Sequence, residues 1–171
     1  MYTVGGCVEK RYKFKDRNQR IRFGKQLSER KINGSVHMID LMDLKKLGLW
    51  QEYEKEANPD YSIEELVTRY PNGGLYGWVV FDNDNNEVTG FVLAVTTDYN
   101  LKSAILITNM YIRPRYRLTN VDALLYEGAE ILGRMIKAEY VYIMVDDIRI
   151  AKWVLRRYPP DDVAVLLARK I

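Results

Sequence analysis

The chain has 171 residues, of which 47% are hydrophobic and 29% are charged. This length and composition indicate one globular domain with a buried core and exclude a disordered chain. The formal net charge is +3, and the single cysteine, Cys7, excludes an intramolecular disulfide and a cysteine zinc site. No apolar run is long enough to cross a bilayer, so we expect a cytoplasmic location and no membrane contact. With a single cysteine in the chain, we also expect no metal ion.

The positive charge is concentrated near the N-terminus. Between Glu9 and Lys31, ten Lys and Arg stand against three acidic residues, a net charge of +7 that leaves −4 for the rest of the chain. We predict a basic arm over residues 1–34, followed by a domain over residues 35–171. Aromatic residues such as Phe14 lie between the charges, so we expect the arm to dock onto a protein partner or a larger assembly. Two alternatives stay open: a solvated segment, and a nucleic-acid contact that no recognised motif accompanies.

The first part of the domain predicts a strand and two helices. Val36, Met38 and Ile39 form the strand. Leucines and Trp50 recur every three residues over 41–50 and predict a helix, which Asn58-Pro59-Asp60 ends. Ser62 then predicts an N-cap, since acidic residues follow in the first turn, where they favour the helix dipole.

Three strands separated by turns follow, over residues 75–81, 87–97 and 103–112. The turn between the first two of these strands, Asp82–Asn86, superficially resembles a calcium loop. However, Glu87 stands where such a loop needs its glycine, and the distal bidentate glutamate is absent. A hairpin turn is therefore predicted.

The second half predicts the longest helix, Asn120–Lys137, with Asn120 as its N-cap and an apolar stripe along one side. Gly128 lies on that stripe, where it would allow close packing against a sheet. The remaining predicted elements are a strand at Tyr140–Val145, a helix through Ala151–Leu155 that ends at Tyr158-Pro159-Pro160, and a strand at Val163–Ala168.

This order of α and β elements resembles the GNAT N-acetyltransferase fold over roughly Ser35 to Lys170. The sharpest local match is Met110 to Arg117, similar to the end of the family's fourth strand, where it enters a Pro-x-Tyr-Arg loop before the main helix. Ala123-Leu124-Leu125 follows where that helix begins to pack, and Ala151 to Tyr158 is similar to the penultimate helix. The resemblance implies an α/β fold with a central twisted mixed sheet flanked by helices, in which the fourth and fifth strands diverge.

In active members of the family, the loop follows the pattern Arg/Gln-x-x-Gly-x-Gly/Ala, and its backbone N–H groups hold the pyrophosphate of acetyl-CoA. Arg117 matches the first position, whereas Asn120 and Asp122 occupy the two glycine positions and Leu118 replaces a further glycine. Asp122 would favour the helix dipole by about 0.3–1 kcal/mol and present negative charge toward a pyrophosphate. If the protein is active, the resemblance implies acetyl-CoA contacts at Ile112, Arg113, Arg117, Leu118, Thr119, Asn120, Val121 and Asp122.

The family's catalytic groups are mostly missing. Its fourth strand commonly carries a carboxylate base, yet Lys102 to Ile112 contains no Asp or Glu. The tyrosine that protonates the leaving thiolate falls at Leu155, and Tyr158, one turn away, is the candidate substitute. Pairing Cys7 with His37, the only histidine, is set aside because no third orienting group accompanies them.

Three functional hypotheses follow. The favoured one is a GNAT-fold protein that has lost acyl-CoA catalysis and serves as a binding or structural component of an assembly. Degenerate members of this kind occur among phage proteins, which would imply a virion location. The second is an active acyl-CoA-dependent N-acyltransferase acting on an amine of a protein or small molecule, and the third is a nucleic-acid-binding protein that uses the basic arm. The first is favoured because the glycines, the base and the tyrosine are missing together.

Overall fold

The computed structural model of the protein describes residues 8–12, 30–99, 101–143 and 163–167, which fall into two compact units. In the first unit, β1 (Val8–Tyr12) pairs antiparallel with β7 (Val163–Leu167), so that Val8 lies opposite Leu167. Residues Glu29–Met144 form the second unit. The predicted helix at Ala151–Leu155 and the candidate acid Tyr158 lie outside the described residues. The predicted boundary between residues 34 and 35 stays a prediction, but β1 lies within the predicted arm and its partner is the last predicted strand.

The second unit is built on a five-stranded mixed sheet with the order β2-β3-β4-β5-β6. Neighbouring strands from β2 to β5 are antiparallel, whereas β6 runs parallel to β5. The parallel pair arises because a long helix connects these two strands and returns the chain to the same end of the sheet. The strands are β2 (Gly34–Ile39), β3 (Leu75–Asp82), β4 (Glu87–Tyr99), β5 (Lys102–Ile112) and β6 (Tyr140–Ile143).

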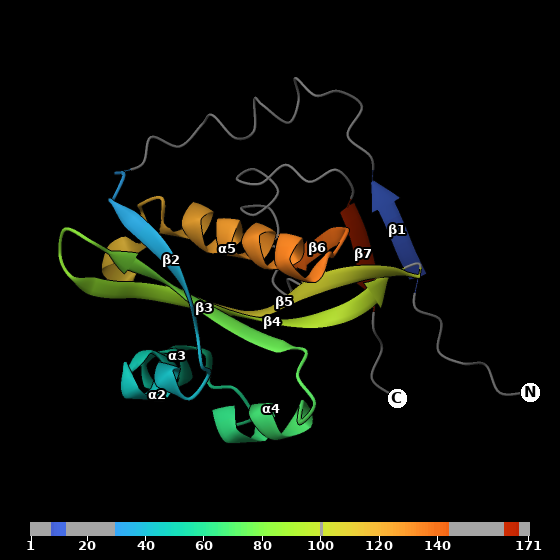
Figure 1. Ribbon diagram of the computed structural model, residues 1–171, viewed down its shortest axis with the longest axis horizontal. Coiled ribbons are helices and arrows are strands. Elements are labelled where there is room, and N and C mark those ends of the chain that lie inside the picture. Colours follow the sequence, from blue (N-terminus) through green and yellow to red (C-terminus); the bar gives the residue numbers. More distant parts are fainter. Residues whose placement is uncertain (1–7, 13–29, 100, 144–162, 168–171) are drawn as a thin grey trace, which may run out of the picture. The chain divides into compact units, whose positions relative to one another are not determined.

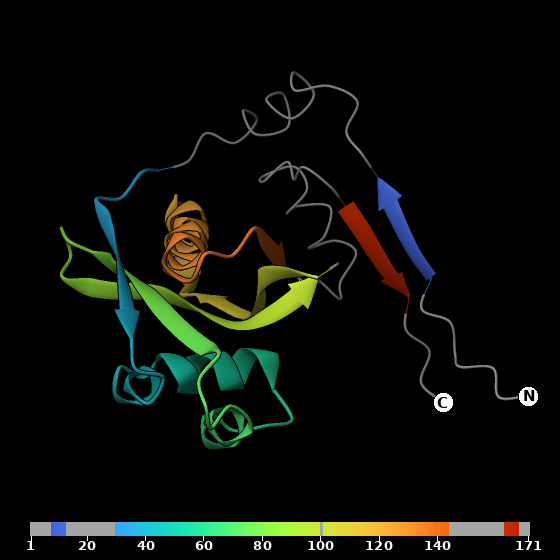
Figure 2. The same ribbon diagram turned by 45° about the vertical axis from the view of Figure 1, so that its right-hand side comes forward.

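Helices cover both faces of this sheet (Figures 1 and 2). One face carries α5 (Val121–Ile136), as predicted, and the other carries α2 (Asp43–Lys46), α3 (Leu49–Ala57) and α4 (Ile63–Arg69). The prediction of one continuous helix from 41 to 58 is wrong. Gly48 adopts a left-handed φ of 73° and separates α2 from α3, a conformation that glycine accepts without steric cost. Within the described ranges, no helix is long and apolar enough to cross a membrane.

The start of α4 confirms the predicted cap. Ser62 Oγ accepts a hydrogen bond from the Glu65 N–H at 3.1 Å, and the Glu65 carboxylate accepts one from the Ser62 N–H at 2.7 Å. This reciprocal capping box satisfies two N–H groups that the helix itself leaves unpaired. The local sequence therefore determines the residue at which α4 begins.

Close packing between α5 and the sheet depends on Gly128, as predicted. The indole N–H of the buried Trp78 on β3 donates to the Leu125 carbonyl on α5 at 2.7 Å. A Cβ atom on Gly128 would lie closer to this indole than any real Cβ contact allows. The helix can approach the sheet this closely only because position 128 has no side chain.

Gly128→Ala is therefore expected to destabilise the protein by about 1–3 kcal/mol, because overpacking outweighs alanine's better helix propensity. Gly133→Ala, in the same helix, is the matched control. Its Cβ would meet only Ile105 Cδ1 at 3.6 Å, an ordinary contact, so the substitution should be neutral or stabilise by up to about 1 kcal/mol. Urea unfolding of both variants checks the difference, and equal effects would contradict the packing argument.

A β-bulge in β5 determines which side chains face which helices. The register changes from Leu93 opposite Asn109 to Ala94 opposite Ile107, which leaves Thr108 as the extra residue. Before the bulge, Ile107 packs in the cluster beneath α5, and after it Tyr111 packs against α3 on the other face. Because side chains alternate along a strand, the extra residue places Asn109 on the α3 side.

The same bulge lies just beyond the described pairing of β5 with β6. Their pairing runs from Ala104 opposite Tyr140 to Ile107 opposite Ile143. Strand β6 is described only as far as Ile143, and Asn109–Ile112 continue toward the loop that precedes α5 paired with β4. The predicted divergence of these two strands concerns residues beyond Ile143 and stays a prediction.

Candidate functional site

The predicted cofactor-binding residues form one continuous segment from the end of β5 into the first turn of α5. The 3-10 helix η1 (Pro114–Tyr116) makes the bend after Arg113. Pro114 suits this position because its fixed φ matches the first turn of a helix and its missing N–H is not needed there. The structure thus brings together Ile112, Arg113, Arg117, Leu118, Thr119, Asn120, Val121 and Asp122.

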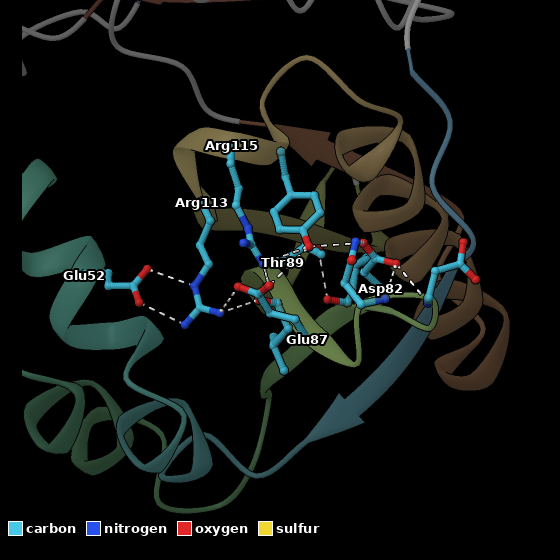
Figure 3. A network of polar contacts seen from close by, with 11 residues as sticks. Glu52, Asp82, Glu87, Thr89, Arg113 and Arg115 are labelled. Atoms are coloured by element: carbon cyan, nitrogen blue, oxygen red, sulfur yellow. Dashed lines mark hydrogen bonds and ion pairs between the residues drawn. The ribbon is translucent and has the colours of Figure 1, made fainter.

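Arg113 connects three elements. Its guanidinium donates to both carboxylate oxygens of Glu52 on α3, at 3.0 and 2.9 Å, and to Glu87 Oε1 at 3.1 Å (Figure 3). It also donates to the Val88 carbonyl at 2.7 Å, and its side chain is only 20% exposed. Such a two-oxygen contact between a guanidinium and a carboxylate is strong and directional. Arg113 therefore holds the end of β5 against α3 and β4.

The other two arginines of the loop are also paired with carboxylates. Arg115 forms an ion pair with Glu87, and its guanidinium lies 4.9 Å from the centre of the Tyr116 ring. Arg117 forms an ion pair with Glu56 on α3 and donates through Nε to the Ile112 carbonyl at 3.0 Å. Each arginine that would attract a phosphate group is thus already neutralised within the protein.

A buried acidic residue anchors the bend. Asp82 at the end of β3 is 1% exposed and accepts hydrogen bonds from the Asp84 N–H at 3.0 Å and from Asn85 Nδ2 at 2.7 Å (Figure 3). The Tyr116 hydroxyl lies 3.1 Å from Asp82 Oδ2 and 3.3 Å from Glu87 Oε2. This network connects the turn between β3 and β4, which is a hairpin turn as predicted, to η1.

The network shifts the pKa of its members. Hydrogen bonds from Arg113 lower the pKa of Glu52, and those from Asn85 lower the pKa of Asp82. Burial, followed by the contact with Asp82, raises the pKa of Tyr116. Both carboxylates are therefore charged at neutral pH and the phenol is neutral, which is the combination that the hydrogen bonds require.

Asn120 does not cap α5 with its side chain, contrary to prediction. It occupies the N-cap position, but its Oδ1 accepts a hydrogen bond from the Ile32 N–H at 2.7 Å. Thr119 Oγ1 instead accepts from the Val121 N–H at 3.3 Å. The side chain of Asn120 is drawn away because the chain before β2 supplies a backbone donor that has no strand partner at that point.

Asp122 differs from its predicted role. It lies in the first turn of α5 as predicted, but it is 3% exposed and takes part in contacts within the protein. Its carboxylate is buried and is not presented to the solvent in front of the helix. Leu118, in contrast, is 86% exposed, so an apolar side chain covers a position where the family often has glycine.

A second polar group, which was not predicted from the sequence, lies on β5 just beyond the bulge. Asn109 is 5% exposed, and its Nδ2 donates to the Tyr53 and Tyr61 hydroxyls at 2.8 and 2.7 Å. The only signal in the sequence is one amide within an apolar strand, next to Thr108. Without the bulge that residue would face α5, so alternation alone gives the wrong face.

Among the described residues, no group of three or more His, Cys, Asp or Glu lies close enough to hold a metal ion. The described side chains of the two sites form hydrogen bonds and ion pairs. The loop offers cations that are already paired, and the α3 side of β5 offers an amide between two phenols.

Comparison with known proteins identifies the fold. No protein-family model matches the sequence, and a search of curated proteins finds no match. Solved structures do match, and the chain has the GNAT acetyltransferase fold, as the order of its elements predicted.

Three of these structures illustrate the likeness. Glucosamine-6-phosphate N-acetyltransferase from Arabidopsis thaliana is 10% identical, with a TM-score of 0.61 over 81% of this chain and 98% of its own. An aminoglycoside acetyltransferase from an uncultured soil metagenomic sample, in complex with sisomicin, is 13% identical, with a TM-score of 0.61 over 81% and 96%. A predicted acetyltransferase from Clostridium acetobutylicum, solved with acetyl-CoA, is 16% identical, with a TM-score of 0.55 over 73% and 88%. At these identities the likeness shows the fold alone.

Proposed function

We propose that this GNAT-fold protein does not hold acyl-CoA at the loop before α5, and that it serves as a binding component of a larger assembly. The observation that carries the proposal is the pairing of Arg113, Arg115 and Arg117 with glutamates of the same protein. A pyrophosphate would have to displace these carboxylates, and it would gain little because the charges are already compensated. In this proposal the basic segment between Glu9 and Lys31 supplies the contact with the partner.

The N-terminal end of α5 is also unsuited to binding a pyrophosphate. The buried Asp122 places a carboxylate in the first turn of α5, where it already compensates the positive end of the helix dipole. The exposed side chain of Leu118 also occupies space beside the loop. Neither residue offers the open backbone that a pyrophosphate needs for close approach.

Titration calorimetry with acetyl-CoA tests the proposal. We expect no saturation up to about 1 mM, equivalent to a binding free energy weaker than about −4 kcal/mol. Glu56→Gln should strengthen binding, because it leaves Arg117 without a carboxylate partner. The Glu56 side chain is 51% exposed, so the substitution changes a surface position. Glu130→Gln makes the same charge change on the exposed surface of α5 and is the matched control. A micromolar dissociation constant for the unmodified protein would overturn the proposal.

A second candidate function is an active acyl-CoA-dependent N-acyltransferase. The polar group at Asn109, on a strand that lacks a carboxylate, favours it. In that case acetyl-CoA would be the cofactor and Tyr158 the residue that protonates the leaving thiolate. Micromolar binding of acetyl-CoA, followed by mass-spectrometric detection of an acetylated amine that Tyr158→Phe abolishes, would establish it.

A further inference from the structure

Strand β2 forms one edge of the five-stranded sheet (Figure 1). The Asn83 N–H donates to the Asn33 carbonyl at 2.9 Å, and the antiparallel pairing of β2 with β3 continues from this pair. Hydrogen bonds to a neighbouring strand alternate along an antiparallel strand, so Gly34, Val36 and Met38 direct their N–H and C=O groups away from β3. Among the described residues, no strand pairs with these groups.

This edge lacks the features that usually prevent a strand from pairing with another chain. Residues Gly34–Ile39 include no charged residue and no proline, and their pairing with β3 contains no bulge. Before the strand, the loop that precedes α5 covers the edge, because Asn120 Oδ1 accepts from the Ile32 N–H at 2.7 Å. The cover that this loop gives ends before β2 begins. In the described structure, β2 is therefore open to a further strand.

Apolar side chains are exposed along the same edge. Met38 within β2 is 39% exposed, and Met42 just after it is 37% exposed. Leu118 is 86% exposed and precedes Thr119, whose backbone bridges to Arg30 just before β2. A strand that paired with β2 would remove part of this apolar surface from water, which favours an occupant that is itself apolar.

The two ends of β2 carry opposite charges. Arg30 and Lys31 precede the strand and Asp40 follows it, and all three are exposed. When two identical strands pair antiparallel, the start of each lies beside the end of the other. A second copy of the chain would therefore bring its Asp40 beside the cations of the first, and the two-fold symmetry would repeat this contact. A parallel pair would instead place like charges together.

We propose that two copies of the chain pair antiparallel through β2, with Val36 of each copy opposite Val36 of the other. In this register Met38 lies opposite Gly34 of the second copy, so the exposed methionine covers a position that has no side chain. Arg30 and Asp40 of the two copies are diagonal neighbours on one face of the joined sheet. The pairing does not depend on whether acyl-CoA binds, and it is independent of the proposed function.

Sedimentation velocity of the full-length protein tests the proposal. We expect a monomer–dimer equilibrium with a dissociation constant of about 10–100 µM, because a contact between two short strands is small and typical of transient complexes. A single monomeric species up to about 500 µM would overturn the proposal.

Two charge reversals test the antiparallel arrangement. Arg30→Asp and Asp40→Arg each place like charges together at both ends of the pair, so each variant alone should dimerise at least about tenfold more weakly. Mixed in equal amounts, they should form a heterodimer about as tightly as the unmodified protein does, because both contacts then join opposite charges. This recovery cannot arise within one chain, since each chain carries only one substitution. A mixture that dimerises no better than its two components would contradict the proposal.

A lysine within the strand tests whether β2 is the surface that pairs. Met38→Lys places a charge on the edge and should abolish the dimer. Met135→Lys makes the same change on α5, where the side chain is 67% exposed, and should leave the dimer unchanged. Circular dichroism checks that both variants keep the fold. If the two variants dimerise equally well, the contact does not lie at β2 and the proposal fails.

Discussion

Arg113→Ala is expected to lower the free energy of unfolding by about 2–4 kcal/mol. The substitution removes contacts with Glu52, Glu87 and the Val88 carbonyl and leaves two carboxylates near each other without their shared cation. Breaking a buried ion pair costs about 3–5 kcal/mol, and we discount this range because Glu52 is 37% exposed. Urea unfolding followed by circular dichroism measures the loss.

Arg134→Ala is the matched control for charge and size. Arg134 lies exposed near the end of α5, so its loss should stay within about 0.5 kcal/mol. Arg113→Lys should recover only part of the stability, because an ammonium group cannot contact both oxygens of Glu52 and also reach Glu87. A loss at Arg113 no larger than at Arg134 would show that the network contributes nothing to stability.

The same variant should change the dependence of stability on pH. The pKa of Glu52 is lowered in the folded protein, chiefly by the hydrogen bonds from Arg113. A lowered folded pKa contributes stability that is present above the unfolded value, about 4.3, and that is lost as the pH falls through the folded value. Arg113→Ala should therefore lose less stability between about pH 5 and pH 3 than the unmodified protein does.

Deleting residues 1–12 is expected to abolish protection of the β7 amides from hydrogen exchange. Strand β1 is the described partner of β7 over all five register positions, from Val8 opposite Leu167 to Tyr12 opposite Val163. Without it, the amides of Val163–Leu167 that pair with β1 should exchange at least about tenfold faster. Peptides from β3, β4 and β5 should keep their protection, because residues Glu29–Met144 have their own sheet and their own core.

Deleting residues 1–6 is the control, since it shortens the N-terminus but leaves β1 intact. Exchange in β7 should then be unchanged. If deleting residues 1–12 also leaves β7 protected, the N-terminal segment is dispensable, as predicted for an arm that docks onto a partner. The pairing of β1 with β7 leads us to expect the opposite, because a two-stranded sheet has no other strand to replace the one that is lost.

Elements with local signals were predictable from the sequence. Ser62 and Glu65 lie three residues apart and cap α4 without help from the rest of the chain, and the turn after Asp82 needs only its own Asp and Asn residues. The break at Gly48 was missed because the leucine spacing continues through it, and glycine inside a helical pattern is often tolerated.

The candidate site was predictable only in part. The loop from Ile112 to Asp122 lies together because its residues are consecutive. Its arginines bond to Glu52 and Glu56, each 61 residues away, and no local pattern predicts such partners. Asn109 was missed because its face depends on the bulge, which in turn depends on the pairing of β5 with β4.

In an alignment, Thr108 behaves as a one-residue insertion within a strand. Ile107 and Met110 pack on the α5 side, and Asn109 and Tyr111 lie on the other, so removing residue 108 would leave each of them on its present face. A deletion at any other point in β5 would invert one part of the strand unless the bulge moved to absorb it. Any comparison with an unbulged strand therefore needs a gap at this position. An ungapped alignment would assign Asn109 to the wrong side of the sheet, even if every residue before the bulge were matched correctly.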